Sequence, residues 1–405
     1  MSGPDGEYPY TNSLVALAAC TPVTARTHQG EWDKIVTPLR VSTWEKGLAD
    51  HPNREFVKFL CTGIREGFRV GFNYREHQCR KASGNMRSVE EHREVVEEYL
   101  YGEKEAGRLL GPFRPSLFPD VHISPFGVIP KSEPGKWRLI LDLSSPEGGS
   151  VNNGISREWC SLSYLSVDEV VRTVVRLGRG ALMAKFDLKA AYRNVPVHPD
   201  DRWLLGMVWE DQLFVDTALP FGLRSAPTIF SAVADGLEFM IRQVGMSDVG
   251  HYLDDFILVG PPKSRVCSMA LQTALGVCSD SGLPLAGEKT VGPATLIPLL
   301  GIELDSERME LRLPSGKLKK LCELVSKWRR RKCCTKRELQ SLAGHLNHAC
   351  KVVRPGWRFL RGVFGLLSQF RKPTHMIRLN AAFRAVLEWI WSGGIALSAH
   401  GMGSQ

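Results

Sequence analysis

The spacing of apolar residues predicts helices at both ends of the chain and a mixed region of strands and helices between them. Near the N-terminus apolar side chains recur every three to four residues, as on one face of a helix, in stretches that begin near Val41, Pro52 and Ser88. Ser88 with Glu91 has the pattern of a capping box, and Gly111 is placed to end that helix. Residues 1–36 are polar and interrupted by Gly and Pro, so we expect a poorly ordered tail.

Short runs of β-branched and aromatic residues predict strands in the middle of the chain. Four hairpins are expected, formed by residues 126–129 with 137–141, 203–217, 251–259, and 299–304 with 309–313. Helices are expected between them, because Ser166 with Glu169 forms a capping box and Pro227 stands where a helix begins. The apolar strand 181–188 carries one carboxylate, Asp187, near its end. An acid there suits a ligand site, and it equally suits the N-cap of the next short helix.

Two adjacent carboxylates, Asp254 and Asp255, stand at the turn of the third hairpin. Neighbouring acids repel each other, and burying them without a partner is costly. Hard carboxylate oxygens are the ligands that Mg²⁺ prefers, so the stretch has the character of one half of a metal site. The other interpretation is a polar turn that happens to contain two acids. The nonamer 251–259 alone does not decide between them.

Composition and charge indicate what kind of protein this is and what kind of partner it binds. The 405-residue chain is 43% apolar and 23% charged, which is typical of a globular protein with two or three domains. No apolar run is long enough to span a membrane, and the ten Cys residues are scattered, so we expect reduced thiols in an intracellular protein. The net charge of +9 is local, because residues 315–372 hold 16 Lys or Arg against two acids. This one-sided charge predicts a polyanionic partner, with a solvated helical face as the alternative.

Two basic helices are predicted in that segment, one over residues 317–332 and one opened by the capping box of Thr335 and Glu338. A group of thiols and imidazoles falls in the same region, namely Cys333, Cys334, His345, His348 and Cys350. Its spacing fits no common zinc finger, so zinc is a minor alternative. The run 327–332 has the composition of a nuclear-import signal, and a nucleic-acid-binding surface explains it equally well. The sequence does not distinguish a cytoplasmic from a nuclear location.

The order of the motifs resembles that of reverse transcriptases of retroelements. The strand that carries Asp187 is followed by Leu219-Pro220-Phe221-Gly222, by Tyr252-Leu253-Asp254-Asp255 and by a hairpin at Gly301. The Y-x-D-D box alone is weak, whereas all the boxes in this order are specific. The stretches 51–74 and 336–344 are similar to retrotransposons of the DIRS type, which carry a tyrosine recombinase elsewhere. The resemblance extends over residues 37–391.

The resemblance implies an α+β right-hand polymerase with fingers, a palm built on a ferredoxin-like antiparallel sheet, and a helical thumb. The implied organisation is a tail over 1–36, a helical extension over 37–112, fingers and palm over 113–314, a basic thumb over 315–372, and a connection-like helix and tail over 373–405. The implied activity is that of an RNA-directed DNA polymerase, a nucleotidyltransferase that extends a primer with dNTPs on an RNA or DNA template.

The resemblance also implies roles for individual residues. Asp187, Asp254 and Asp255 would be the catalytic, metal-binding acids, which hold two Mg²⁺ ions, with Mn²⁺ as a substitute. The residues implied to contact the incoming dNTP are Lys131, Arg138, Leu188, Tyr192, Phe221, Gly222 and Lys289. In this set Tyr192 is the steric gate that disfavours a ribose 2′-hydroxyl, Arg138 offers a bidentate fork, and Lys289 is a candidate general acid. Retroviral enzymes usually have Gln where this chain has Phe221, so the nucleotide contacts differ there.

Two further groups of residues are implied to hold the nucleic acid. Leu300, Gly301 and Ile302 resemble the primer grip. The basic helices would follow duplex phosphates without reading the sequence, through Lys327, Arg329, Arg330, Arg331, Lys332, Lys336 and Arg337. The chain has no Asp or Glu after Glu388, so we expect no RNase H in it, and expect RNase H or recombinase modules elsewhere in the parent element. We expect no membrane partner.

Two alternatives remain open at this point. One is a catalytically inactive relic of a retroelement that keeps its affinity for nucleic acid. The other is an RNA-templated RNA polymerase, which shares a palm with paired Asp residues and which an aromatic gate at Tyr192 disfavours. Each side chain also has a structural interpretation, because Tyr192 and Phe221 suit a core, Asp187 a helix cap, and Lys289 a solvated surface. The joint order of the motifs favours the catalytic interpretation.

Overall fold

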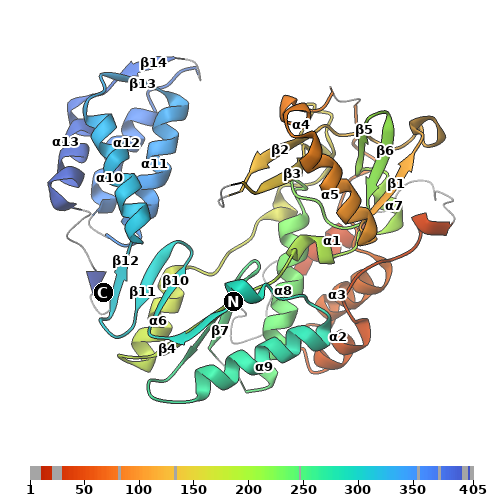
Figure 1. The fold of residues 1–405 in the computed structure, drawn as a ribbon, viewed down its shortest axis with the longest axis horizontal. Coiled ribbons are helices and arrows are strands. Elements are labelled where there is room, and N and C mark those ends of the chain that lie inside the picture. Colours follow the sequence, from red (N-terminus) through yellow and green to blue (C-terminus); the bar gives the residue numbers. More distant parts are fainter. Residues whose placement is uncertain are drawn as a thin grey trace. The chain divides into compact units, whose positions relative to one another are not determined.

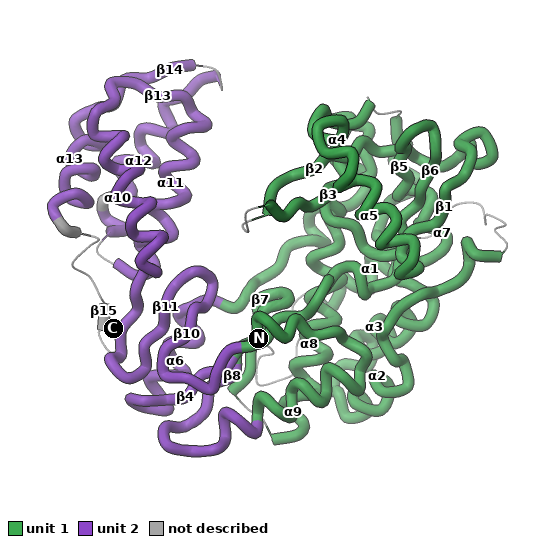
Figure 2. Tube along the Cα trace, viewed as in Figure 1, with its two compact units in different colours: residues 1–165, 185–257, 270–290 green, residues 166–184, 258–269, 291–405 purple. Residues whose placement is uncertain are grey.

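The structure, a computed structural model, describes residues 11–20, 30–80, 84–131, 135–245, 248–353, 356–372, 375–394 and 400–401. The chain divides into two compact units, which Figure 2 distinguishes by colour. Unit 1 comprises residues 1–165, 185–257 and 270–290, and unit 2 comprises residues 166–184, 258–269 and 291–405. Among the described residues, no helix combines the length and the apolar character needed to cross a membrane.

Unit 1 contains most of the helices of the N-terminal half (Figure 1). They are α1 (Thr11–Ala19), α2 (Val41–Gly47), α3 (Arg54–Glu66), α4 (Arg87–Glu91), α5 (Arg93–Glu105), α7 (Pro199–Arg202), α8 (Ala226–Gln243) and α9 (Val266–Ser281), whose first residues belong to unit 2. Helix α3 packs on α8. Gly236 of α8 permits this approach, because a Cβ there would lie 2.8 Å from Leu60 and 2.9 Å from Trp44. The helical faces predicted for α2 and α3 are therefore confirmed as core-facing.

Short 3₁₀ turns connect these elements. They are η1 (Gly30–Trp32), η2 (Pro115–Leu117), η3 (Val151–Gly154), η4 (Glu158–Cys160), η5 (Ala191–Asn194) and η6 (Gly287–Lys289). The short helix expected after the strand that carries Asp187 is the 3₁₀ turn η5, which begins at Ala191. The residue before η5, Ala190, has a left-handed backbone with φ of 53°.

Two small antiparallel sheets complete the upper part of unit 1 as drawn in Figure 1. Strands β1 (Leu109–Phe113), β5 (Gly206–Trp209) and β6 (Gln212–Asp216) pair in the order β1-β6-β5, and β2 (Phe126–Pro130) pairs with β3 (Trp137–Leu141). The β5–β6 turn has positive φ at Glu210 (47°) and Asp211 (57°), as two-residue hairpin turns require. Both predicted hairpins are confirmed, and residues 132–134 of the β2–β3 connection lie outside the described residues.

A four-stranded sheet in the order β7-β8-β4-β9 carries the three predicted acids. Its strands are β4 (Leu182–Asp187), β7 (Val249–Tyr252), β8 (Asp255–Gly260) and β9 (Val291–Ala294). Helix α6 (Val167–Leu177), in unit 2, begins at the predicted capping box, in which Ser166 and Glu169 bind each other's backbone N–H. It ends at Gly178, whose φ of 98° suits glycine.

Unit 2 also holds a meander and the C-terminal helices. Strands β10 (Leu296–Leu299), β11 (Ile302–Asp305), β12 (Glu310–Arg312) and β15 (His400–Gly401) pair in that order. The helices are α10 (Ser315–Arg329), α11 (Lys336–Cys350), α12 (Gly356–Leu367) and α13 (Ala381–Trp389), which continues as a π-helix over Ile390–Gly394. Strands β13 (Cys333–Thr335) and β14 (Met376–Arg378) pair beside them. The capping box of Thr335 and Glu338 is confirmed at the start of α11.

Two predicted element boundaries are wrong. Ser88 does not cap a helix, because it lies inside α4 and its Oγ accepts a hydrogen bond from the Val128 N–H at 3.0 Å. Gly111 does not end a helix, because α5 stops at Glu105 and Gly111 belongs to β1, where a Cβ would lie 2.6 Å from the Leu213 carbonyl oxygen. In both cases pairing with a distant strand overrides the local signal.

The strand expected over 299–304 is also interrupted. Leu300 and Gly301 have positive φ of 48° and 77° and turn the chain between β10 and β11, so three strands replace the predicted two. The poorly ordered tail expected over 1–36 is wrong for residues 11–19, which form α1 with Leu14 and Leu17 fully buried. Residues 1–10 and 21–29 lie outside the described residues.

Candidate active site

Strand β4 presents Asp187 at its C-terminal end. Met183 and Phe186 are fully buried and anchor the strand, and Asp187 itself is 8% exposed. The Asp187 carbonyl accepts a hydrogen bond from the Ala286 N–H at 2.9 Å, and its Oδ2 accepts one from Nζ of Lys289 at 3.1 Å. Asp187 does not cap the turn that follows, because Ala190 is the residue before η5. The helix-cap interpretation of this acid is therefore wrong.

The β7–β8 hairpin brings the other two acids to the same place. Its turn contains Leu253, with φ of 54°, and Asp254, and Asp255 begins β8. The Asp254 carbonyl accepts a hydrogen bond from the N–H of Leu188 at 3.1 Å, so the turn lies against the residue that follows Asp187. Beneath it the rings of Phe186 and Phe256 stack at 4.9 Å with 8° between their planes. The fold thus joins two acidic segments that are far apart in sequence.

The electrostatics of this group point to excess negative charge. Burial raises the pKa of Asp254, and the neighbouring Asp187 charge raises it further. Burial also raises the pKa of Asp187, although the hydrogen bond from Lys289 partly offsets the effect. Partial burial works against protonation of Lys289, but its bond to Asp187 and the surrounding acids raise its pKa overall. The half-exposed Lys289 thus contacts the buried Asp187, while Asp254 is partly buried and forms no ion pair among the described residues.

These donors suit a divalent cation. Carboxylate oxygens are hard ligands, and a bound cation removes the repulsion that raises the pKa of Asp187 and Asp254. Nζ of Lys185 lies 3.8 Å from Oδ1 of Asp255, so the third acid has a cation of its own nearby. The ligand atoms of the three acids do not all lie within 4.8 Å of one another. Their oxygens would therefore have to converge on a shared ion.

In the described part of the chain, a different group of three side chains has ligand atoms that all lie within 4.8 Å of one another: Asp235, Glu238 and His251. Nε2 of His251 lies 2.9 Å from Asp235 and 3.7 Å from Glu238, and Nη2 of Arg242 lies 2.8 Å from Glu238. Burial acts to lower the pKa of His251. The hydrogen bond to Asp235 and the charges of Asp235 and Glu238 outweigh this and raise the pKa overall. When His251 is protonated, two cations balance two anions, and we interpret the group as an ion-pair network next to the hairpin.

Aromatic residues predicted to contact a nucleotide form a cluster next to η5. The Tyr192 ring meets Phe221 edge-on at 5.5 Å and Phe230 at 5.3 Å. The Arg138 guanidinium lies over the Phe221 ring, 4.7 Å from its centre. Arg138 is exposed, whereas Tyr192 and Phe221 are partly buried. The structure therefore brings together three of the predicted dNTP contacts, with the cation held by the aromatic face.

Gly222 has a backbone that only glycine suits. Its φ is 104°, and a Cβ would lie 2.3 Å from the Leu141 carbonyl oxygen. The side-chain amide of Asn152 clamps this turn, since its Nδ2 donates to the Gly222 carbonyl and its Oδ1 accepts from the Arg224 N–H, each at 2.8 Å. Sequence reasoning missed Asn152, which is buried and 70 residues away from Gly222. An Asn in a Gly-rich loop carries no local signal of this role.

The other predicted dNTP contacts are less clustered. Lys131 is exposed at the end of the β2–β3 hairpin, where its N–H donates to the Lys136 carbonyl at 2.8 Å. Leu188 is 1% exposed, so its side chain belongs to the core and its backbone N–H binds the Asp254 carbonyl. The structural interpretation is thus favoured for the Leu188 side chain. Lys289 is placed beside Asp187, as described above.

In unit 2 the predicted primer-grip residues form the β10–β11 turn. Nε2 of His348, on α11, donates to the Leu300 carbonyl at 3.1 Å, and Ile302 is fully buried. A Cβ at Gly301 would lie 1.9 Å from Nζ of Lys317, the amine of the first Lys in α10. The turn is therefore surrounded by basic side chains. His345, His348 and the three neighbouring Cys residues form no metal-binding group among the described residues, and all ten Cys are free thiols.

The basic residues of α10 and α11 fall into two classes. Arg329 pairs with Glu388 through two hydrogen bonds of 3.0 and 2.9 Å and lies over the Trp391 ring. Arg331 pairs with Glu338 at 2.5 Å and lies over Trp328. The exposed members of the predicted set are Lys327, Arg330, Lys332 and Arg337, and Lys336 is partly exposed. Sequence reasoning treated all seven alike, because their carboxylate partners are set by the fold.

Comparison with known proteins agrees with this geometry. The profile of the family described as reverse transcriptase (RNA-dependent DNA polymerase) matches residues 129–304. Polyprotein P3 of Commelina yellow mottle virus is 26% identical over 250 residues, which are 62% of this chain and 12% of that protein. The retrovirus-related Pol polyprotein from transposon 412 of Drosophila melanogaster is 24% identical over 160 residues, 40% of this chain and 12% of that protein. The matches span about an eighth of these curated relatives.

Solved structures give the same fold. The foamy viral protease-reverse transcriptase dRH in complex with ds DNA has a TM-score of 0.58 and 18% identity, and the match covers 92% of this chain and 62% of that one. The foamy viral protease-reverse transcriptase in complex with RNA/DNA hybrid has a TM-score of 0.58 and 17% identity, with 93% and 48% covered. The predicted α+β right-hand polymerase fold is confirmed.

Residues 129–304 therefore match the reverse transcriptase family, and the similar proteins named above are polyproteins of a virus and of a transposon. Domains of this family are nucleotidyltransferases that use divalent metal ions, which agrees with the carboxylate donors described above.

Proposed function

We propose that this chain is an RNA-directed DNA polymerase that extends a primer with dNTPs, as part of a retrotransposon. One observation carries the proposal. Within the reverse transcriptase domain, Asp187 and Asp254 lie at neighbouring backbone positions and have raised pKa values, so their charges lack full compensation from the protein. A site that keeps two acids in this condition is suited to a divalent cation and to the phosphates that accompany it.

In this proposal Asp187 and Asp254 hold two Mg²⁺ ions, with Mn²⁺ as a possible substitute, and Asp255 supports them. Bound divalent cations supply electrostatic stabilisation of the phosphoryl group and activation of the primer 3′-hydroxyl. The chain's own residues bind and orient the substrate. Arg138 and Lys131 bind the triphosphate, and Gly222 leaves room for close approach of the nucleotide to the backbone. Lys289 is placed to donate a proton to the leaving pyrophosphate.

Tyr192 is proposed as the gate against ribonucleotides. Its ring is held between Phe221 and Phe230, so it cannot move aside without disturbing both. A fixed ring of this size under the sugar would collide with a 2′-hydroxyl and leave a deoxyribose unaffected. This supports dNTPs over rNTPs as substrates, and it disfavours an RNA-templated RNA polymerase.

The remaining assignments rest on the same family. We propose fingers and palm over 113–314 after a helical extension over 37–112, a basic thumb over 315–372, and a connection-like segment over 373–405. The turn Leu300-Gly301-Ile302 acts as the primer grip. The solved relatives bind ds DNA or RNA/DNA hybrid, which supports a template–primer duplex as the partner of this chain. We assign the parent element to the DIRS type, with RNase H or recombinase modules encoded elsewhere in it.

Primer extension by the purified chain on an RNA template tests the proposal, with Mg²⁺, dNTPs and the variant Asp254→Asn. The parent should extend the primer, and the variant should lose at least about a thousandfold in rate while duplex binding persists. Asp211→Asn is the matched control, because Asp211 is an exposed acid in the β5–β6 turn whose positive φ Asn tolerates.

Other outcomes select the alternatives. If neither protein extends a primer that both bind tightly, the chain is a binding relic. If the parent uses rNTPs as fast as dNTPs, it is an RNA polymerase. If Asp254→Asn also loses duplex binding, Asp254 has a structural role.

A further inference from the structure

Arg193, which follows the proposed gate Tyr192, is a buried arginine whose guanidinium group makes hydrogen bonds to several segments of the chain. It is 3% exposed. Its Nε donates to Oε2 of Glu103 at 2.8 Å, and its Nη2 donates to Oδ1 of Asp216 at 2.6 Å and to the Arg108 carbonyl at 3.3 Å. Two of the three guanidinium nitrogens thus bind these acceptors, and a buried cation with this many acceptors is held in one geometry.

The third nitrogen connects Arg193 to the nucleotide site. Its Nη1 donates to the carbonyls of Ala218 and Leu219, at 3.3 and 3.5 Å. The Leu219 N–H in turn donates to the Val195 carbonyl at 3.0 Å, so the same stretch is bound by the backbone that leaves η5. Leu219 is two residues before Phe221, whose ring meets Tyr192 and lies under Arg138. Arg193 thus joins the two segments that carry the aromatic cluster.

The network around Arg193 is balanced in charge. Glu103 also accepts two hydrogen bonds from Arg108, at 2.7 and 2.8 Å, so two guanidinium groups face two carboxylates. Glu103 comes from α5 and Asp216 from the end of β6. Three segments distant in sequence therefore fix one side chain. Because the group is already neutral, it has no need of a further ligand.

We propose that Arg193 is a positioning residue that sets the nucleotide selectivity of this site, by fixing the separation between Tyr192 and the segment 218–221. This inference rests on the function proposed above. A gate works only if the ring cannot retreat from the 2′-hydroxyl, and displacements of about 1 Å in a reactive site change rates by up to about a hundredfold. Arg193 does not contact the substrate, so its effect passes through Tyr192 and Phe221.

The test is Arg193→Lys in the full chain, assayed by primer extension with dNTPs and rNTPs separately. Lys keeps the charge but has one nitrogen, so it cannot bind Asp216, Glu103 and the carbonyls of 218–219 together. We expect the ratio of kcat/KM for dNTP over rNTP to fall roughly tenfold or more. The loss should lie mainly in a higher KM for dNTP and a lower KM for rNTP, with duplex affinity unchanged.

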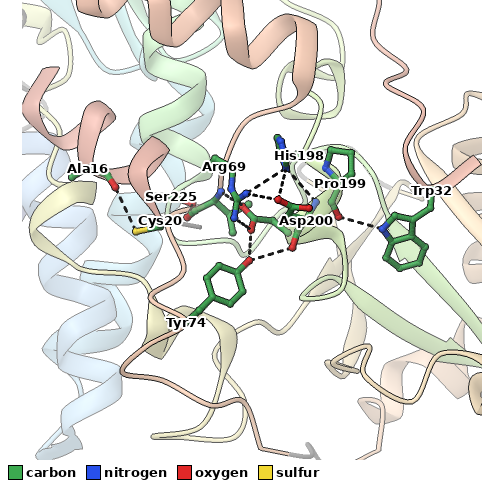
Figure 3. Close-up of polar contacts among 11 residues, drawn as sticks. Ala16, Cys20, Trp32, Arg69, Tyr74, His198, Pro199, Asp200 and Ser225 are labelled. Atoms are coloured by element: carbon green, nitrogen blue, oxygen red, sulfur yellow. Dashed lines mark hydrogen bonds and ion pairs between the residues drawn. The ribbon is translucent and has the colours of Figure 1, made fainter. Parts of the chain in front are cut away.

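Arg69→Lys is the matched control. Arg69 is 8% exposed and binds Asp201 through two hydrogen bonds, of 3.0 and 2.7 Å, and Asp200 at 3.0 Å. Figure 3 shows Arg69 beside Asp200 and His198, with Tyr74 on the far side of the same network. This variant removes an equally buried guanidinium fork. It should lower thermal stability as Arg193→Lys does, and it should leave the dNTP-to-rNTP ratio at the parental value.

Glu103→Gln keeps the inference testable if Arg193→Lys fails to fold. It removes one carboxylate partner and leaves Asp216 in place, so a smaller fall in the dNTP-to-rNTP ratio, about two- to fivefold, is expected. A parent that extends the primer with an unchanged ratio in every variant that folds would falsify the role of Arg193 and leave the polymerase intact. A parent with no extension on any template overturns the proposed function itself.

Discussion

The chain buries two pairs of carboxylates in opposite ways. Glu103 and Asp216 face Arg193 and Arg108, and the Asp216 and Arg193 side chains are 2% and 3% exposed. Burial and the nearby Asp187 charge raise the pKa of Asp254, and the Lys289 side chain that binds Asp187 is 51% exposed. The first pair is neutralised by the protein itself. The second pair is left to be neutralised by something that binds.

This difference in charge compensation distinguishes the acids proposed to bind metal from the structural acids better than burial does. Asp187 and Asp216 are buried and Glu103 and Asp254 are partly buried, so burial alone does not distinguish the two pairs. The distinguishing feature is the kind of cation: two guanidinium groups bind the first pair, whereas the half-exposed amine of Lys289 contacts Asp187 in the second.

The largest expected effect compares Asp216→Asn with Asp254→Asn in buffer free of divalent ions. Asp216→Asn leaves the Arg193 charge under-compensated in the core and should lower the free energy of unfolding by about 3 kcal/mol. Asp254→Asn removes a carboxylate whose pKa the fold raises, and should therefore increase the melting temperature. Differential scanning calorimetry of parent and variants measures both effects.

Magnesium sharpens the same experiment. Added Mg²⁺ should raise the melting temperature of the parent and of Asp216→Asn, and should leave Asp254→Asn almost unchanged, because ligand binding stabilises only the form that binds. If both substitutions lower stability equally and Mg²⁺ affects all three proteins alike, the contrast between the two pairs of acids is wrong.

A smaller effect is expected from pH, through His251. Its buried Nδ1 has no hydrogen-bond partner among the described residues, but Asp235 and Glu238 at its Nε2 raise its pKa, with Arg242 on the far side of Glu238. A raised pKa means that the folded state binds the proton more tightly. The stabilisation is therefore complete below the unfolded pKa of about 6.5 and is lost as pH rises through the higher folded value.

The melting-temperature difference between the parent and His251→Gln measures this contribution. It should be largest below about pH 6.5 and should shrink as the pH rises above that value. Asp280→Asn, on α9, serves as an exposed control for substitution of a surface side chain. A constant difference for His251→Gln would mean that the imidazole is neutral throughout.

The sequence predicted the features that depend on the order of the motifs along the chain or on contacts between residues close in sequence. The order of the motifs predicted the three acids as one site, and this remains a prediction. The capping boxes at Ser166 and Thr335 are confirmed, because a cap is a contact between residues three apart. The same cap pattern was wrong at Ser88, where a neighbouring strand takes the hydroxyl. A local pattern is reliable only where no distant partner competes for the same atoms.

What the sequence did not predict depends on pairing at long range. Arg193 is 90 residues from Glu103, and Asn152 is 70 residues from Gly222, so no spacing or periodicity connects them. Arg193 follows Tyr192 directly and is easily mistaken for a surface charge on a short turn. Only the fold reveals that its side chain points into a charged core and not toward solvent.

The smallest expected effect concerns the basic helix α10, where a paired arginine can be compared with an exposed one. Arg329 is engaged by Glu388 and Trp391, whereas Arg330 is exposed on the same helix end. If duplex phosphates bind this helix, Arg330→Gln should reduce the salt dependence of binding by about 0.9 in the slope of log K against log salt, and Arg329→Gln should change it much less.

Glu388→Gln releases Arg329 and should steepen the slope. Fluorescence anisotropy of a labelled duplex between about 50 and 200 mM salt measures all three. Equal losses for Arg329→Gln and Arg330→Gln would mean that the pair with Glu388 opens on binding, so that a cation satisfied within the fold remains available to a phosphate.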